Sequence, residues 1–422
     1  MKKTYKVGSL FAGVGGICLG FLQAENEKAK YELAWANEID EYASATYREN
    51  FNHLLLEGDI ELILNPTQVE VKINKIEQEL QHLSSSLESN NDRKLTSHIK
   101  KLENELNELK NKHAEQYYEK LREKILSVEI DVLNGGFPCQ AFSIAGEQKG
   151  FDDERGNLFL SIVNLINQLG GRHKKPRVLL LENVKNLMSH DQGRTYPVIK
   201  KQLEKCGYTI YEAVLNTMHF TDLPQNRERI YIVGFLNKKD ADKFQLFNCL
   251  SDYKNNKDSL ERIEDVKKVI DYENTDSKYF YTKEKYPQYF MNEEDFITQS
   301  LNKKGVRINL EESIDEMYQF YQLRRGMYVR KNMSDVCPTL TANMGTGGHN
   351  VPLVKTPNGI RKLTPAEAFK LQGFPVGDGY KLPIEYKGRP YADSHLYKQA
   401  GNAVSVPVIK LIAEEILRVL ED

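Results

Sequence analysis

The sequence predicts an α/β fold: a doubly wound, mostly parallel sheet in the main domain, with a smaller mixed domain and an inserted helical hairpin. Its 422 residues are too many for one compact core. Short apolar segments typical of buried strands recur along the chain, at residues 6–11, 33–38, 130–133 and 178–181. Glu38 ends one of them and Glu182 follows another, as polar groups do at the ligand-binding edge of an open α/β sheet.

The first apolar segment runs into a glycine-rich loop. Residues 6–11 are typical of a strand, residues 12–16 hold three glycines, and residues 17–22 open a helix. A strand, a glycine loop and a helix together form a cradle typical of nucleotide binding. The spacing does not match GxGxxG, because Cys18 stands five residues after Gly13, so a nicotinamide dinucleotide site is disfavoured.

A carboxylate ends each of the next two strand-like segments. Glu38 closes residues 33–38, and Asp59 closes the segment that begins at residue 54. A carboxylate at the first position suits ribose hydroxyls, and one at the second can accept a hydrogen bond from an adenine amino group. Taken singly, each acid is more typical of a solvated loop, so a nucleoside-type ligand is predicted only by their order after the glycine loop.

Cys139 stands in a turn-forming run after the apolar segment 130–133. Gly135 and Gly136 tolerate positive φ and Pro138 fixes its own φ, so the chain must leave the strand sharply. This turn predicts a thiol held toward a cleft, which is the position of a nucleophile. A lone cysteine among apolar residues is more often a small core side chain, so the rest of the chain has to decide between the two.

Composition limits the remaining classes. No apolar run is long enough for a membrane span or a signal peptide, which predicts a cytoplasmic protein without a membrane partner. The five cysteines show no CxxC spacing, so neither a disulfide framework nor a metal site is expected. The formal net charge is −2, so any contact with DNA must come from a local basic patch.

Ordered motifs resemble those of bacterial cytosine-5 DNA methyltransferases of the restriction-modification type. They lie at residues 11–16, 37–38, 58–60, 136–143, 182–184, 225–229, 361–368 and 399–404. The resemblance covers most of residues 5–60, 127–236 and 337–421. It implies a methyltransferase domain with S-adenosylmethionine as cofactor, double-stranded DNA as partner and 5-methylcytosine as product, and protection of DNA from a cognate restriction endonuclease.

The residue types fit this chemistry. Cytosine C5 is a poor nucleophile, and its ring can be activated by adding a thiolate at C6, which we expect from Cys139. Glu182 is expected to donate a proton or a hydrogen bond to N3. Arg227 and Arg229 alternate before the strand 230–235, so both can face one cleft, and the resemblance places Arg229 at the target nucleotide. The target base is stacked in a duplex, so it must swing out to react.

The resemblance implies the cofactor site. The residues expected there are Phe11, Gly13, Gly15, Gly16, Glu38, Ile39, Asp59, Ile60, Pro138, Leu158, Asn402 and Ala403. Phe11 is expected against adenine, and Pro138 and Leu158 beside the methionine chain. Asn402 implies that the final helix, predicted at residues 406–420 from its apolar spacing, packs beside the N-terminal strand.

Contacts with DNA are expected from two regions. Residues 140–150 have the small, polar composition of a closing loop, and the Tyr-rich stretch before Cys337 is the expected target-recognition domain. The expected DNA-binding residues are Gln140, Ser143, Arg324, Arg325, Arg330, Lys331, Thr339 and Leu340. Arginine can read guanine with two hydrogen bonds in the major groove, whereas Lys331 is suited to phosphate.

An insertion between residues 59 and 130 departs from the resemblance. Its apolar residues alternate steps of four and three within residues 69–87 and 95–109, which predicts an antiparallel coiled-coil hairpin. Residues 66–126 carry eleven basic and eleven acidic residues, so tracking along phosphates is not expected. Self-association, a protein partner, bracing of the recognition domain and no function at all stay open.

These expectations divide the chain into five parts. They are the cofactor-binding part of the catalytic domain (1–65), the hairpin (66–126), the catalytic part (127–240), the target-recognition domain (241–358) and a C-terminal part that completes the catalytic domain (359–422). Two other functions stay open: methylation of cytosine in RNA, which would use the same thiol and carboxyl group, and a non-catalytic S-adenosylmethionine-binding scaffold.

Overall fold

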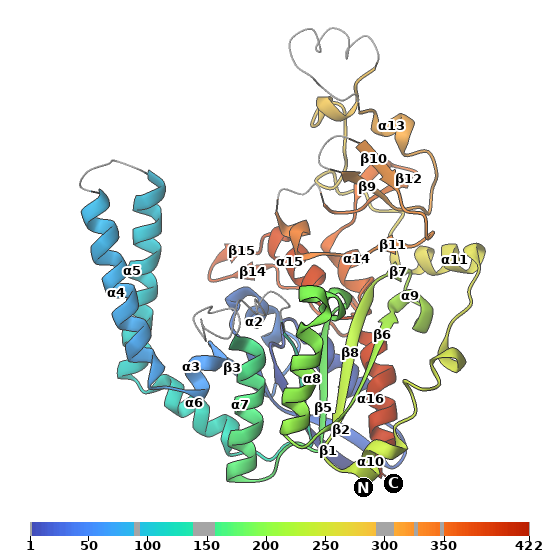
Figure 1. Cartoon of the computed structure of the whole chain (residues 1–422). Coiled ribbons are helices and arrows are strands. Elements are labelled where there is room, and N and C mark those ends of the chain that lie inside the picture. The colour runs from blue at the N-terminus through green and yellow to red at the C-terminus, as the bar shows by residue number, and fades with distance from the viewer. Residues whose placement is uncertain are drawn as a thin grey trace.

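A seven-stranded sheet forms the centre of the computed structural model (Figure 1), which describes residues 2–87, 93–137, 157–292, 308–324, 328–346 and 350–421. Its strands are β1 (Lys3–Leu10), β2 (Ala29–Glu38), β3 (Leu54–Glu57), β4 (Val132–Gly136), β5 (Val178–Val184), β6 (Thr209–Asn216) and β8 (Glu228–Phe235). Their order is β3-β2-β1-β4-β5-β8-β6; the first five are parallel, and β8 is antiparallel to both neighbours. This order is doubly wound about β1, so the predicted mostly parallel α/β sheet is confirmed.

Helices cover both faces of this sheet. One face carries α1 (Gly16–Gln23), α10 (Lys238–Lys243) and α16 (Val406–Glu421), and the other α3 (Ile60–Leu64), α6 (Tyr117–Leu126), α7 (Asn157–Arg172) and α8 (Thr195–Lys205). In β5, Val178 and Leu180 are buried in the first apolar core, and Leu179 and Leu181 in the second. A strand buried on both faces needs a continuous apolar run, which explains why this strand could be predicted from the sequence.

The final helix packs beside the N-terminal strand, as predicted. The hydroxyl of Tyr5 in β1 donates to the carbonyl of Leu420 at 2.6 Å, and that of Tyr31 in β2 donates to the carbonyl of Ala413 at 2.9 Å. Apolar side chains of α16 fill the core between α1 and the sheet. The two ends of the chain therefore close one domain.

The insertion forms two helices that stand away from the body of the molecule (Figure 1), α4 (Gln68–Leu87) and α5 (Arg93–Ala114). Glu70 pairs with His113, and Glu79, farther along α4, pairs with His98, so the two helices run antiparallel. Seam residues of both helices join the second core of the sheet; they are Val69, Ile73, Ile76, Leu102 and Leu109. That the seam is a coiled coil stays a prediction.

A second, antiparallel sheet lies on the side of the central sheet away from the two termini (Figure 1), and we call it the recognition sheet. Its strands are β9 (Tyr321–Arg324), β10 (Tyr328–Lys331), β12 (Leu353–Thr356) and β13 (Gly359–Lys362), in the order β10-β9-β12-β13. β12 and β13 pair with each other, so this sheet continues past the boundary predicted at residue 358. The α4–α5 hairpin stands apart from it, which gives no support to a bracing role.

Short elements connect these parts. They are α2 (Glu41–Arg48), η2 (Lys185–Met188), η3 (His190–Gly193), α9 (Thr217–Phe220), β7 (Gln225–Asn226), η4 (Leu250–Tyr253), α11 (Ser259–Val269), η5 (Pro287–Tyr289), α13 (Leu310–Ser313), β11 (Cys337–Pro338), η6 (Ala342–Gly345), α14 (Pro365–Lys370), β14 (Glu385–Tyr386), β15 (Arg389–Pro390) and α15 (Asp393–Asn402). Within the described ranges, no helix combines the length and apolarity needed to cross a membrane.

Candidate active site

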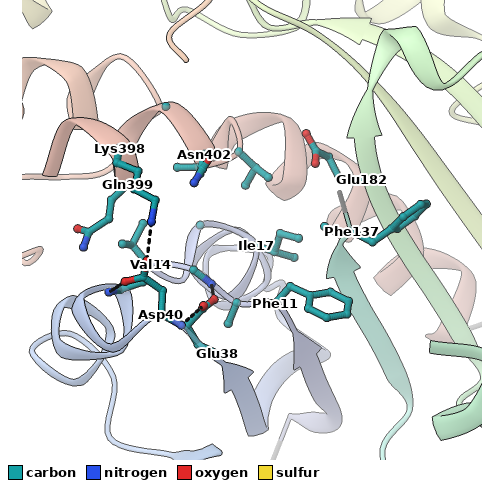
Figure 2. A pocket seen from close by; sticks show the side chains of 18 of the residues that line it. Phe11, Val14, Ile17, Glu38, Asp40, Phe137, Glu182, Lys398, Gln399 and Asn402 are labelled. Carbon is teal, nitrogen blue, oxygen red and sulfur yellow. Dashed lines mark hydrogen bonds and ion pairs between the residues drawn. The ribbon is translucent and has the colours of Figure 1, made fainter. Parts of the chain in front are cut away.

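A cavity of about 360 Å³ opens at the carboxyl ends of β1, β2, β4 and β5. Its walls come from the loop after β1, the ends of β2, β4 and β5, the start of β8, and helix α15 (Figure 2). The predicted site residues that line it are Phe11, Gly13, Gly16, Glu38, Glu182, Arg227, Arg229, Asn402 and Ala403. Sheet topology thus brings motifs from both ends of the sequence to one edge.

The glycine loop and Glu38 form one end of the cavity. The backbone N–H of Gly13 donates to Glu38 Oε2 at 2.7 Å, and the N–H groups of Ile39 and Asp40 donate to Oε1 at 2.9 and 2.8 Å. Phe11 and Gly13 have φ of 53° and 56°, so the chain turns through the left-handed region here. Burial raises the pKa of Glu38, although the three N–H donors oppose that shift. The carboxylate is fixed in place by the loop that it faces.

Glu182 and Arg229 form an ion pair at the other end of the cavity. Arg229 Nε lies 3.1 Å from Glu182 Oε1, and the two side chains are 13% and 11% exposed. The antiparallel pairing of β5 with β8 brings their backbones together, because Val184 stands opposite Arg229. Burial raises the pKa of Glu182, while Arg229 and then Arg227 act in the opposite direction. A carboxyl group that holds a proton at higher pH than usual is suited to general-acid chemistry.

Arg227 also lines the cavity, but its guanidinium is used within the protein. Nη1 donates to the carbonyl of Leu340 at 2.8 Å, and Nη2 donates to those of Ala403 at 2.5 Å and Gly401 at 3.3 Å. The side chain is 2% exposed, and burial lowers the pKa of Arg227 to about 9, with Arg229 as the next cause. These bonds tie the start of β8 to α15 and to the chain after β11.

Replacing Arg227 with methionine is expected to lower the free energy of unfolding by roughly 3–5 kcal/mol, because buried carbonyls lose their donor. Urea denaturation followed by circular dichroism measures this change. The matched control is Lys185→Met, which removes an exposed pair with Glu228 and should cost less than about 0.5 kcal/mol. If the two variants are equally stable, the three carbonyl contacts do not support the fold.

Helix α15 supplies cavity residues that the sequence analysis did not identify. Lys398 Nζ lies 2.7 Å from Asp40 Oδ2, which links α15 to the start of α2 across the cavity (Figure 2). Asp40 also caps α2 through the N–H groups of Tyr42 and Ala43. An aspartate just before a helix is a recognisable capping signal, so Asp40 could have been found. Its pairing with Lys398 carries no such local signal.

Several predicted cofactor residues lie off the cavity wall. Asp59 caps α3 by accepting a hydrogen bond from the N–H of Glu61 at 2.9 Å, and the Ile60 side chain is buried in the second core. Leu158 packs against that core, and Ile39 is 67% exposed. Gly15 has a φ of 83° and precedes α1. Their roles toward a cofactor stay predictions.

Two predicted DNA contacts are also engaged within the protein. The hydroxyl of Thr339 donates to the carbonyl of Asn226 at 2.6 Å. Leu340 is fully buried, and its N–H donates to the side chain of Gln225 at 3.3 Å. Both residues join the chain after β11 to β7, which directly precedes Arg227, and no DNA contact follows from these bonds.

Five predicted residues lie outside the described residues; they are Pro138, Cys139, Gln140, Ser143 and Arg325. The strand that leads toward Cys139 nevertheless ends at the cavity. Asn183 Nδ2 donates to the carbonyl of Phe137 at 2.7 Å, and a Cβ on Gly136 would lie 3.3 Å from Glu182 Oε2. β4 therefore ends directly beside the carboxyl group expected to act on the base.

The chain resembles known proteins along nearly its whole length. Residues 5–77 and 86–418 match the family described as C-5 cytosine-specific DNA methylase. Type II methyltransferase M.Bsp6I of Bacillus sp. (strain RFL6) is 39% identical over 420 residues, which cover 98% of each chain. Type II methyltransferase M.HhaI of Haemophilus parahaemolyticus is 30% identical over 413 residues, 96% of this chain and 92% of that one.

Solved structures share the architecture at lower identity. The Dnmt2 methyltransferase of S. pombe aligns with a TM-score of 0.55 and 16% identity over 100% of both chains. The Entamoeba histolytica methyltransferase EhMeth aligns with a TM-score of 0.54 and 16% identity, again over 100% of both chains. At this identity the likeness supports the fold alone.

Proposed function

This chain belongs to the C-5 cytosine-specific DNA methylase family and is a DNA cytosine-5 methyltransferase, and from that premise we propose that it modifies one short DNA sequence with S-adenosylmethionine as methyl donor. The observation that carries the proposal is the buried pair of Glu182 and Arg229 beside the end of β4, the strand that leads to Cys139. A cognate restriction endonuclease is the expected counterpart, as the type II names of the relatives suggest.

Each of three residues has a distinct role in this proposal. The Cys139 thiolate adds to C6 of a cytosine that has swung out of the duplex, and electron density moves toward N3. Glu182 donates a proton or a hydrogen bond to N3, which its raised pKa favours. Arg229 holds Glu182 in place and offers its remaining N–H groups to the nucleotide. After C5 has received its methyl group, loss of the C5 proton, loss of any proton taken up at N3 and release of the Cys139 thiolate restore the aromatic ring.

The residues around Glu38 fit S-adenosylmethionine. Glu38 lines the cavity, and its carboxylate, held by backbone N–H groups, is suited to accept hydrogen bonds from ribose hydroxyls. Phe11, Val14 and Ile17 give the cavity an apolar wall. A Cβ on Gly13 would meet no atom within 4 Å, so the loop leaves open space there. Asn402 lines the opposite wall. When bound, S-adenosylmethionine supplies the methyl group that cytosine C5 receives.

Base-resolution 5-methylcytosine sequencing tests the function. DNA from a methylation-free bacterial host that expresses the protein should carry 5-methylcytosine at one short motif, and DNA from the same host with an empty vector should carry none. Transfer RNA from the same cells should gain no 5-methylcytosine. If only RNA gains 5-methylcytosine, the substrate is RNA and not DNA. If neither gains it, the result favours a scaffold role.

Replacing Glu38 with glutamine is expected to weaken S-adenosylmethionine binding about tenfold or more, a loss of about 1.4 kcal/mol or more. One acceptor oxygen becomes an NH2 donor that faces backbone N–H groups. Isothermal titration calorimetry measures the affinity. The control is Glu41→Gln, which changes an exposed carboxylate paired with Lys387. Equal affinity in the two variants would remove Glu38 from the cofactor site.

A further inference from the structure

The two faces of the recognition sheet contact different parts of the molecule. On one face, Tyr321 and Leu323 of β9 pack with Leu353 of β12 and Ile360 of β13 into a separate apolar cluster. Tyr321 stands opposite Leu353, and side chains alternate along a strand, so these residues share this face. We call it the outer face, because the cluster that covers it in the described part of the chain contains no residue of the central sheet.

The opposite face is directed toward the catalytic half. Val354 stands opposite Arg361 in the pairing of β12 with β13, and Val354 is buried in the same core as α16. Arg361 Nη2 lies 2.6 Å from Glu367 Oε1 in α14, and both side chains are almost completely buried. At β13 this inner face therefore lies against α14. Helix α14 packs in the same core as α15, which lines the cavity.

Four side chains of β9 and β10 lie on the inner face. The register places Arg324 opposite Tyr328 and Gln322 opposite Arg330, and alternation puts all four on the side opposite Tyr321 and Leu323. Tyr328 is 53% exposed and Arg330 is also exposed. Among the described residues, neither Arg324 nor Arg330 has a hydrogen bond or an ion pair.

Gln322 adds an independent sign of a missing partner. Its side chain is 9% exposed, and its Oε1 accepts no hydrogen bond from the described part of the chain. A buried acceptor without a donor is costly. In the strand pairing Gln322 stands opposite Arg330, so the two side chains leave the same face of the sheet next to each other. Gln322 is thus placed to orient Arg330 when that side chain binds a ligand.

Lys331 differs from the two arginines. It stands opposite Tyr321, on the outer-face side of β10, and its Nζ lies 2.6 Å from Glu316 Oε1. The three described members of the predicted basic cluster therefore separate into two arginines on the inner face, without an ion pair to any described residue, and one lysine paired with Glu316 on the other side. Lys331 is the matched control within the same strand.

We infer that Arg324 and Arg330 read guanine edges in the major groove of the substrate duplex, with Gln322 as a positioning residue for Arg330. A two-stranded ribbon fits the major groove, and each guanidinium can donate two hydrogen bonds to guanine O6 and N7. From Lys331 the chain reaches β11 at Cys337, and β11 pairs with β7 beside Arg227. Six residues span at most about 20 Å, the length of about six base pairs, so the end of β10 lies within that distance of β11.

This inference rests on the proposed function and is tested on the motif found by methylation sequencing. The full-length protein and its Arg324→Ala, Arg330→Ala and Lys331→Ala variants are assayed on duplexes in which each guanine in turn is 7-deazaguanine. That base pairs normally but lacks the N7 acceptor. In the wild type, kcat/KM should fall about tenfold at each guanine that an arginine reads.

The variants separate direct readout from general damage. Each arginine variant should lose roughly ten- to a hundredfold in kcat/KM on the normal motif and show no further loss at its own 7-deazaguanine position. Lys331→Ala should keep the wild-type response at every guanine. In Gln322→Ala, the loss of kcat/KM caused by 7-deazaguanine should become smaller only at the guanine assigned to Arg330.

The outcomes distinguish the inference from the proposed function. A wild type that methylates no DNA motif contradicts the proposed function and the inference with it. An active wild type that tolerates 7-deazaguanine at every position overturns the inference alone. The same holds if both arginine variants show the full wild-type response. Because the 7-deazaguanine arm uses the wild type, it remains decisive even if a variant fails to fold.

Discussion

Replacing Cys139 with serine is expected to reduce DNA methylation by a factor on the order of 10⁴ or more, as loss of a covalent nucleophile does in other enzymes. A serine hydroxyl stays protonated at neutral pH, so addition at cytosine C6 has no comparable nucleophile. The measurement is transfer of a labelled methyl group to a duplex that carries the motif. Unchanged S-adenosylmethionine affinity shows that the variant is folded.

A trapping experiment separates this prediction from a simple loss of activity. A 5-fluorocytosine at the target position has no C5 proton to release, so the thiol adduct cannot resolve after methyl transfer. With S-adenosylmethionine present, the wild type should form a denaturant-stable complex with this DNA, and Cys139→Ser should form none. Replacing buried Cys337 with serine leaves the trap intact if the protein folds. A stable complex with Cys139→Ser would assign the nucleophile to another residue.

The sheet and the cavity end of each strand were predictable because they depend on local patterns. The apolar run of β5 identified the strand, and a carboxyl group at its end marked Glu182. Glu38 was found in the same way at the end of β2. Strand ends of a parallel sheet meet at one edge whatever the intervening sequence, so local signals were sufficient there.

The walls contributed by distant segments were not predictable. Asp40 and Lys398 are 358 residues apart, and nothing in either segment selects the other. Ile60, expected at the cofactor, opens α3 with its side chain in the core, and its role toward a cofactor stays a prediction. Arg227 and Arg229 have the same alternation in sequence, yet Arg227 donates to three distant carbonyls, whereas Arg229 pairs with the Glu182 carboxylate and donates to the carbonyl of its neighbour Glu228. The packing around each side chain, and not its spacing in the sequence, determines which groups it contacts.

The same limit applied to the basic cluster of the recognition sheet. Arg330 and Lys331 are adjacent, so a strand sends them to opposite faces, but which face is open depends on the pairing of β9 with β12. That pairing joins Tyr321 to Leu353 across the intervening β10 and β11, and no local signal in either segment selects the other. Sequence composition could therefore locate the basic cluster but could not show that its residues lie on two different faces of the sheet.

Replacing Glu182 with glutamine is expected to lower kcat by about 10²–10⁴-fold, because an amide can donate a hydrogen bond to N3 but cannot transfer a proton. S-adenosylmethionine affinity should stay within about twofold, which is about 0.4 kcal/mol, since Glu38 lies at the other end of the cavity. Single-turnover methylation of a motif duplex measures the chemical step. Glu212→Gln is the control, because that carboxylate pairs with Lys200 away from the cavity.

The pH profile gives the sharper test of Glu182. Burial raises the pKa of its carboxyl group, so the proton it must donate is present below that pKa and lost as pH rises through it. The thiolate of Cys139 has the opposite requirement and forms as pH rises. The wild type should therefore show a bell-shaped profile whose alkaline limb belongs to Glu182, and Glu182→Gln should lose that limb while keeping the acidic one. An unchanged alkaline limb in Glu182→Gln would assign the proton to a different group.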